Sequence, residues 1–175
     1  MGLQREYIER GGFSAYLYYQ DGETIVASNG VEGKVVVKID GTSYDGLPIY
    51  SNTCEVYFKR NKNGEIVQAR IYKDRKPVCD FDWDHPHKNR KSGETFEEGV
   101  VHVQEFKQKP DGSWYRDSKH ARYMSPDEMK RYGELIKKAN PNAKLRDKLT
   151  YCLWSIILNT YRCLLAAVIL ETASR

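Results

Sequence analysis

The chain has 175 residues and a mass of 20.3 kDa, which is close to the size of a single domain. Hydrophobic residues make up 40% of it and charged residues 30%, a balance that excludes disordered and collagen-like chains. The formal net charge of +4 is too small to indicate nucleic-acid binding by itself, but it argues against an acidic mimic of DNA.

The first part of the chain predicts a sheet over about residues 13–116, because short runs rich in Tyr, Val and Ile are separated by turn signals. The expected strands are Ser14–Tyr19, Thr24–Ser28, Lys34–Ile39, Cys54–Lys59, Ile66–Tyr72, Pro77–Trp83, Val100–Phe106 and Ser113–Tyr115. Tight turns are expected at Asp21-Gly22, Asn29-Gly30, Asp40-Gly41, Asn63-Gly64 and Asp111-Gly112, whose residues tolerate positive φ. These pairs favour antiparallel hairpins over βαβ units.

A helix is predicted to begin at Pro126. Ser125 is a favourable N-cap, Pro126 suits the first helical position, and Glu128 stands where it would complete a capping box. The helix should end near Ala139, because Pro141 disfavours helical geometry in the residue before it.

The last segment is the most hydrophobic. Residues 149–170 carry a single charge, Arg162, and as a helix they would be long enough to cross a bilayer. Arg162 would cost about 2.5–3.5 kcal/mol at the centre of a membrane span, which favours a helix packed on the domain or in an oligomer interface. We therefore expect an α+β domain over residues 1–143 and an apolar helix over residues 144–175.

The cysteines and the N-terminus bear on the compartment. Cys54, Cys79, Cys152 and Cys163 form no CxxC pair and no spacing typical of a structural zinc site, so reduced thiols are expected. The first residues carry charges where a secretory signal peptide has an apolar segment. The sequence thus predicts a cytoplasmic protein.

One stretch, residues 78–87, concentrates groups that could carry chemistry. Alternation along a strand puts Asp80, Asp82 and Asp84 on one face, opposite Cys79, Phe81 and Trp83. Three carboxylates this close need a cation, a shared proton or open access to water. Pro86 would end the strand and leave His85 and His87 at its exit.

A second strand, over residues 100–106, places His102 and Gln104 on one face. If it pairs with the aspartate strand, His102 would face the carboxylates. Two chemistries then follow: Asp and His ligands could hold a divalent metal that activates water, or His87 and His102 could act as general base and acid without a metal. A solvent-facing strand edge with a polar His-Pro-His turn is the alternative without chemistry.

The positive excess lies between Lys107 and Lys148. Contacts with a polyanion are therefore expected there; a solvated helix face is the alternative. The residues selected for such contacts are Lys119, His120, Arg122, Lys130 and Arg131.

Residues 69–72 (ARIY), 80–87 (DFDWDHPH) and 102–106 (HVQEF) resemble small modules at the ends of bacterial polymorphic toxins and in phage or mobile-element proteins. The resemblance extends to the helix start at residues 125–128 and to the KRYG run at residues 130–133. In all, it covers about residues 65–138. In those modules the later strand tends to read His-x-His, whereas this sequence has Gln104 in the second position. Because a glutamine cannot transfer a proton at physiological pH, the departure bears directly on two-histidine chemistry.

Taken together, these features predict an α+β protein: an antiparallel sheet over about residues 13–116, a capped helix, and a long apolar C-terminal helix. The expected function is that of a toxin-like or phage-linked module acting on nucleic acid. In its nuclease form the catalytic residues would be His87, His102 and Asp82, and Asp80, Asp82, Asp84 and His85 would bind a divalent metal. Two alternatives stay open: a non-catalytic inhibitor that binds a host nuclease or defence complex, and an interaction protein that oligomerises or is membrane-anchored through residues 149–170.

Overall fold

The computed structural model describes residues 3–10 and 13–146. Their elements, in chain order, are β1 (Gln4–Arg10), β2 (Phe13–Val26), β3 (Glu32–Lys38), β4 (Val56–Arg60), β5 (Ile66–Lys73), β6 (Lys76–Asp82), β7 (His87–Lys88), β8 (Thr95–Phe96), β9 (His102–Gln108), β10 (Trp114–Arg116), the 3₁₀-helix η1 (Ser118–His120) and α1 (Pro126–Ala139).

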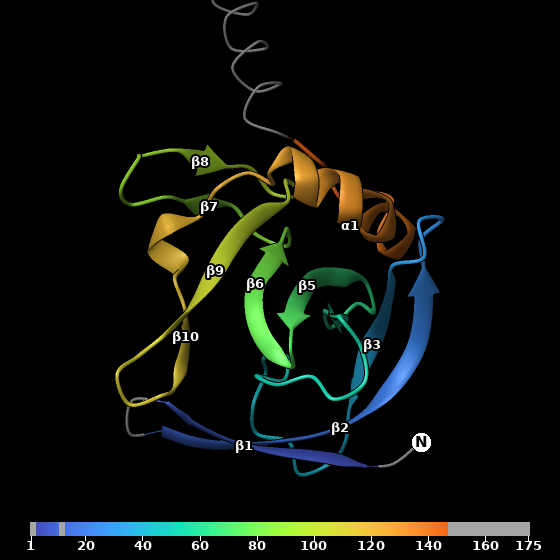
Figure 1. The fold of residues 1–175 in the computed structure, drawn as a ribbon, viewed down its shortest axis with the longest axis vertical. Coiled ribbons are helices and arrows are strands. Elements are labelled where there is room, and N and C mark those ends of the chain that lie inside the picture. Colours follow the sequence, from blue (N-terminus) through green and yellow to red (C-terminus); the bar gives the residue numbers. More distant parts are fainter. Residues whose placement is uncertain (1–2, 11–12, 147–175) are drawn as a thin grey trace, which may run out of the picture.

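Eight of the strands form one sheet, in the order β1-β2-β3-β4-β5-β6-β9-β10, and β7 pairs with β8 in a separate ribbon. All neighbours in the large sheet are antiparallel except β3 and β4, which are parallel. The sheet curls strongly, so that β1 returns towards the β9–β10 hairpin (Figure 1). α1 lies at the end of the curled sheet opposite β1 (Figure 1). Residues 39–55 make the crossover that the parallel pair requires, without a helix.

The expected α+β class is wrong. The described residues are mostly β structure, and α1 is the single α-helix among them. The predicted apolar helix over residues 149–170 lies outside the described part of the chain. Within that part, no helix combines the length and the hydropathy needed to span a membrane.

The turn signals were only partly correct. Asn29-Gly30, Asn63-Gly64 and Asp111-Gly112 join antiparallel neighbours, but Asp40-Gly41 opens the long crossover. Asp21-Gly22 is wrong as a turn, because β2 continues through it with a register shift between Asp21 and Thr24. A Cβ at Gly22 would lie 2.7 Å from Cγ2 of Val37 on the next strand, so glycine serves close strand packing there.

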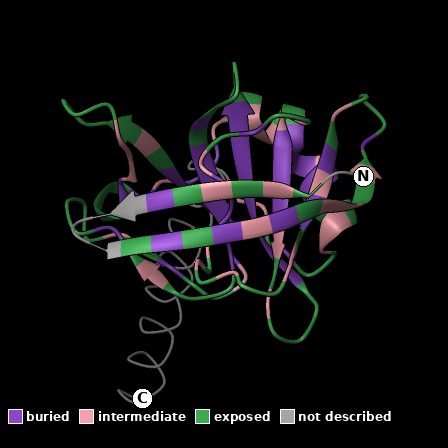
Figure 2. Ribbon diagram, turned by 90° about the horizontal axis from the view of Figure 1, so that it is seen from below, coloured by how far each residue is buried: buried purple, intermediate pink, exposed green. Residues whose placement is uncertain are grey.

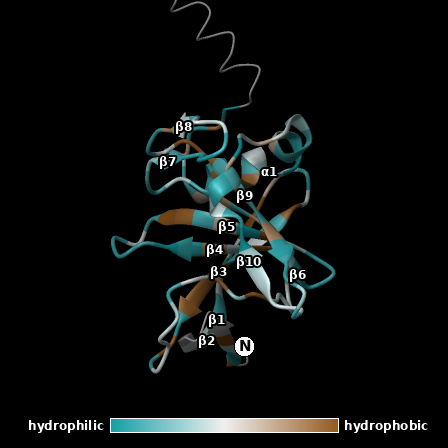
Figure 3. Ribbon diagram, turned by 90° about the vertical axis from the view of Figure 1, so that its left-hand side faces the viewer, coloured by the Kyte–Doolittle hydropathy of each residue, from teal (hydrophilic) through white to brown (hydrophobic). Residues whose placement is uncertain are grey.

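The outer face of the sheet packs against α1. Phe58, Ile71, Phe81 and Val103 are buried there beside helix residues such as Leu135. Burial alternates along β1 and β2 (Figure 2), whereas β5 is buried on both faces; the peripheral loops are hydrophilic (Figure 3). Because successive side chains of a strand point to opposite faces, every second residue points to the inner face of the sheet, which the curl encloses.

The inner face is unusually polar for a buried surface. Tyr57, Arg70 and Asp80 are all buried on it, together with a smaller apolar cluster that includes Leu17 and Leu47. The crossover over residues 39–55 covers this face, and its carbonyl groups at Leu47 and Pro48 accept hydrogen bonds from Arg70 Nη1 at 2.7 and 3.0 Å.

The predicted helix is confirmed. α1 begins at Pro126, the Ser125 side chain accepts from the Glu128 backbone N–H at 3.2 Å, and the Glu128 carboxylate accepts from the Ser125 N–H at 2.7 Å. It ends at Ala139, with Asn140 as C-cap. Local capping chemistry thus fixes where the chain changes from sheet to helix.

Candidate metal centre

The pairing of β6 with β9 builds the centre. The two strands are antiparallel neighbours, with Asp82 directly opposite His102 and Asp80 opposite Gln104. All four side chains are buried on the inner face. The conditional prediction that His102 would face the aspartates is therefore confirmed.

The chain then turns back over this pair. Pro86 follows the end of β6, and β7 pairs with β8 so that His87 lies opposite Phe96. The His87 ring stacks on the His102 ring at 5.0 Å between centroids, and Phe96 stacks on the His102 ring at 5.3 Å. His85 contacts His102 edge-on, at 5.7 Å. The short ribbon thus holds the exit histidines over the buried one.

Two groups of ligand atoms result. One ring nitrogen each from His85, His87 and His102 lie within 4.8 Å of one another, and so do single atoms of Asp82, Asp84 and His85. His85 is exposed, His87 is half-buried and His102 is fully buried, so the cluster runs from the protein interior to solvent. A bound ion would keep a side open to water.

Each histidine has one ring nitrogen held by an acceptor. His102 Nδ1–H donates to the Val100 carbonyl at 3.2 Å, and His87 Nε2–H donates to the Ser118 carbonyl at 2.7 Å. His85 Nδ1 contacts the Asp84 carboxylate and lies 3.6 Å from Asp82 Oδ1. Each ring keeps its other nitrogen for a cation, which is the arrangement that metal-binding histidines generally adopt.

Two buried atoms of this cluster have no hydrogen-bond partner within the described structure. They are Asp82 Oδ1 and His102 Nε2; Gln104 Oε1, further along β9, is a third. A buried polar atom without a partner costs about 1–3 kcal/mol, so a native protein rarely leaves two at one place without a ligand.

Burial also sets the charges of the cluster. It raises the pKa of Asp82 to about 6 and lowers the pKa of His102 to about 4, against smaller opposing effects from His85 and the Val100 carbonyl. His102 is therefore neutral at pH 7, which is the form that coordinates a metal.

The donor set fits a transition metal ion. Imidazole nitrogens suit Zn²⁺, Fe²⁺ or Ni²⁺ better than Mg²⁺, which prefers oxygen ligands. Tetrahedral Zn²⁺ places nitrogen ligands about 3.4 Å apart. The three ring nitrogens, which lie within 4.8 Å of one another, would move closer together to reach that spacing.

Asp80, a predicted metal ligand, is not brought into the cluster. Its carboxylate accepts from Arg70 Nε at 2.6 Å, from Arg70 Nη2 at 2.8 Å and from Gln68 Nε2 at 2.9 Å. Arg116 Nη1 lies 3.2 Å from Asp80 Oδ2 and 3.4 Å from Asp82 Oδ2. Asp80 thus anchors two arginines, and Arg116 links it to the centre.

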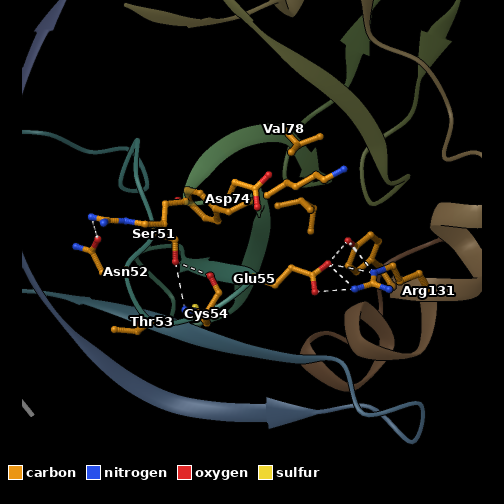
Figure 4. A pocket seen from close by; sticks show the side chains of 13 residues that line it. Ser51, Asn52, Thr53, Cys54, Glu55, Asp74, Val78 and Arg131 are labelled. Carbon is orange, nitrogen blue, oxygen red and sulfur yellow. Dashed lines mark hydrogen bonds and ion pairs between the residues drawn. The ribbon is translucent and has the colours of Figure 1, made fainter.

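Three of the five residues predicted to bind a polyanion are held by carboxylates of the protein itself. Arg122 is paired with Glu105 and Glu128, and His120 Nδ1 lies 2.7 Å from Asp117 Oδ2. Arg131 is held by Glu55 at the edge of a cavity beside Cys54 (Figure 4). Lys119 and Lys130 are exposed, the first on η1 and the second on α1.

Sequence reasoning missed Arg70 and Arg116. The available signal for Arg70 was its place in a run of otherwise apolar or neutral residues on β5, where a charge must find a partner. Arg116 gave no such signal, because it stands at the end of a three-residue strand.

The comparisons with known proteins add no relative. No protein-family model matches the chain, and neither the curated proteins nor the solved structures contain a match.

Proposed function

We propose that this chain is a metal-dependent phosphodiesterase of the toxin-like or phage-linked kind, acting on nucleic acid in the cytoplasm. One observation carries the proposal: the unpartnered His102 Nε2 and Asp82 Oδ1 are buried beside His85 and His87, whose other ring nitrogens are already held. A cation bound by these side chains would give the buried polar atoms the partner that they lack.

The roles follow from position. His85, His87 and His102 would hold the ion, which supplies Lewis-acid activation of water and phosphate. Asp82 Oδ1, beside His85, would accept the proton of the attacking water. Arg116, which is about one-third exposed at its side chain, would contact a non-bridging phosphate oxygen. The free thiols of Cys54 and Cys79 are compatible with a reducing compartment.

Calorimetric titration of the full chain with Zn²⁺, Mn²⁺ and Mg²⁺ tests the metal site. We expect one Zn²⁺ per chain and much weaker binding of Mn²⁺ and Mg²⁺, which prefer oxygen ligands. His85→Ala should lose at least tenfold in affinity, since a ligand is removed; because His85 is exposed, this variant should still fold. His120→Ala is the matched control, as His120 lies outside the cluster.

Hydrolysis of single-stranded RNA and DNA oligonucleotides tests the reaction. Activity should require the bound ion and should be lost in Asp82→Asn. If the protein binds no transition metal and cleaves neither nucleic acid, the hydrolase proposal fails. The non-catalytic inhibitor of a host nuclease or defence complex would then be the better interpretation.

A further inference from the structure

A second cavity opens on the inner face, between the first and last strands of the curled sheet. It has a volume of about 490 Å³, within the range of sites for small ligands. β1, β5, β9, β10 and the crossover over residues 39–55 all contribute to its lining. Its lining includes Glu6, Tyr44, Tyr50, Gln68, Trp114 and Arg116.

Two aromatic side chains of this cavity, Tyr50 and Trp114, contact no other ring among the described residues and make no side-chain hydrogen bond. Tyr44 differs, because it packs against the apolar cluster that includes Leu17 and Leu47, and a Cβ at Gly46 would clash with Cζ of its ring. Phe106 also differs, because the Arg70 guanidinium covers its ring at 4.5 Å. Tyr50 and Trp114 therefore line the cavity without a ring partner of their own and could receive a planar group.

The cavity also offers hydrogen-bonding groups. Glu6 Oε2 accepts from the Ile49 N–H at 2.8 Å, and Gln68 donates to Asp80, which leaves its carbonyl oxygen as an acceptor. Burial raises the pKa of Glu6 to about 7, so its carboxyl group can donate or accept near neutral pH. A planar ligand with polar edges suits this lining better than a purely apolar one.

Arg116 connects the cavity to the metal centre. Its side chain lines the cavity, and its Nη1 lies 3.4 Å from Asp82 Oδ2. The other oxygen of the same carboxylate lies 3.6 Å from His85 Nδ1. A single carboxylate thus separates the guanidinium that faces the cavity from the histidine cluster.

We propose that this cavity is a nucleobase subsite of the hydrolase, which binds one unstacked base of a single-stranded nucleic acid. The inference rests on the proposed function. The base would stack on the rings of Tyr50 and Trp114, and the phosphate attached to its nucleoside would contact Arg116 on the way to the metal centre. A base in a duplex would first have to be flipped out of the stack at a cost of about a few kcal/mol, so single-stranded nucleic acid is the favoured substrate class.

The test is calorimetric titration of the full chain, in EDTA, with the four nucleoside 5′-monophosphates, and separately with the nucleosides and with inorganic phosphate. Tyr50→Ala should weaken binding of nucleosides and nucleotides about tenfold, a typical loss for one base-stacking ring. Tyr16→Ala is the matched control: Tyr16 is similarly exposed, at 41% against 44% for Tyr50, but does not line the cavity. Inorganic phosphate alone should bind equally to both variants.

Two results would overturn the proposal: no binding of any nucleoside or nucleotide at millimolar concentration, or equal losses in Tyr50→Ala and Tyr16→Ala. Because the titration is done in EDTA, it does not depend on the metal. Nucleotide binding without metal binding would refute the proposed hydrolase and leave the base-binding subsite standing. Metal binding without nucleotide binding would refute the subsite and leave the metal-dependent hydrolase standing.

Discussion

Two aspartates on one strand are expected to respond oppositely to the same substitution. Asp80 accepts hydrogen bonds from Arg70, Gln68 and Arg116, and Arg70 is only 3% exposed. Asp80→Asn would leave the Arg70 guanidinium buried without its counter-charge. Removing one partner of such a pair costs about 3–5 kcal/mol of unfolding free energy. For a chain of this size the melting temperature should fall by about 6–20 °C.

Asp82→Asn should leave stability unchanged or raise it. Burial already disfavours the charged form of Asp82 and raises its pKa to about 6. Asp82 Oδ1 has no hydrogen-bond partner, so replacing the carboxylate with an amide breaks no hydrogen bond at that atom. The same variant should lose nuclease activity. Loss of function without loss of stability separates a site residue from a structural one.

Urea unfolding followed by tryptophan fluorescence measures both variants, with Asp45→Asn as control. Asp45 pairs with Lys38 and Lys59, but its side chain is 89% exposed, so its loss should cost less than about 1 kcal/mol. Wild-type stability in Asp80→Asn, or a greater loss in Asp82→Asn than in Asp80→Asn, would refute this division of roles.

Two further predictions concern stability. The folded-state pKa of Glu6 is raised from 4.5 to about 7, so between these values the folded state holds a proton that the unfolded state has released. The free energy of unfolding should therefore fall by up to about 3 kcal/mol as pH rises from 4.5 to 7. Glu6→Gln should remove that slope in urea titrations at several pH values; an unaltered slope would contradict the assignment. Ser125→Ala removes the N-cap of α1 and should cost about 1 kcal/mol. Ser125→Thr should restore most of the loss, and equal stability of all three proteins would show that the capping box contributes nothing.

The sequence predicted local structure well where the signal was chemical and short in range. Ser125, Pro126 and Glu128 defined the start of α1, because capping depends on neighbours within one turn. The run from Ile66 to Tyr72 was predicted as a strand, and β5 is a strand there. Alternation along the two strands also predicted that His102 would face the aspartates if the strands paired, and β6 and β9 do pair.

Long-range packing decided the features that the sequence did not reveal. A strand through Asp21-Gly22 depends on how closely β3 approaches, which no local pattern encodes. Asp74 and Arg75 make the β5–β6 turn with positive φ although neither is glycine. Asp80 looked equivalent to Asp82, and only the cross-strand partner Arg70 distinguishes them.

The central claim is that His85, His87 and His102 share one transition metal ion. Titration of Co²⁺ into the full chain, followed by visible absorption, tests it most directly, because cobalt bound by several histidines at low coordination number absorbs far more strongly than the aqueous ion. We predict strong bands that saturate at one equivalent in the wild type and are lost in His85→Ala. A spectrum that stays that of aqueous cobalt in the folded wild-type protein would contradict the account.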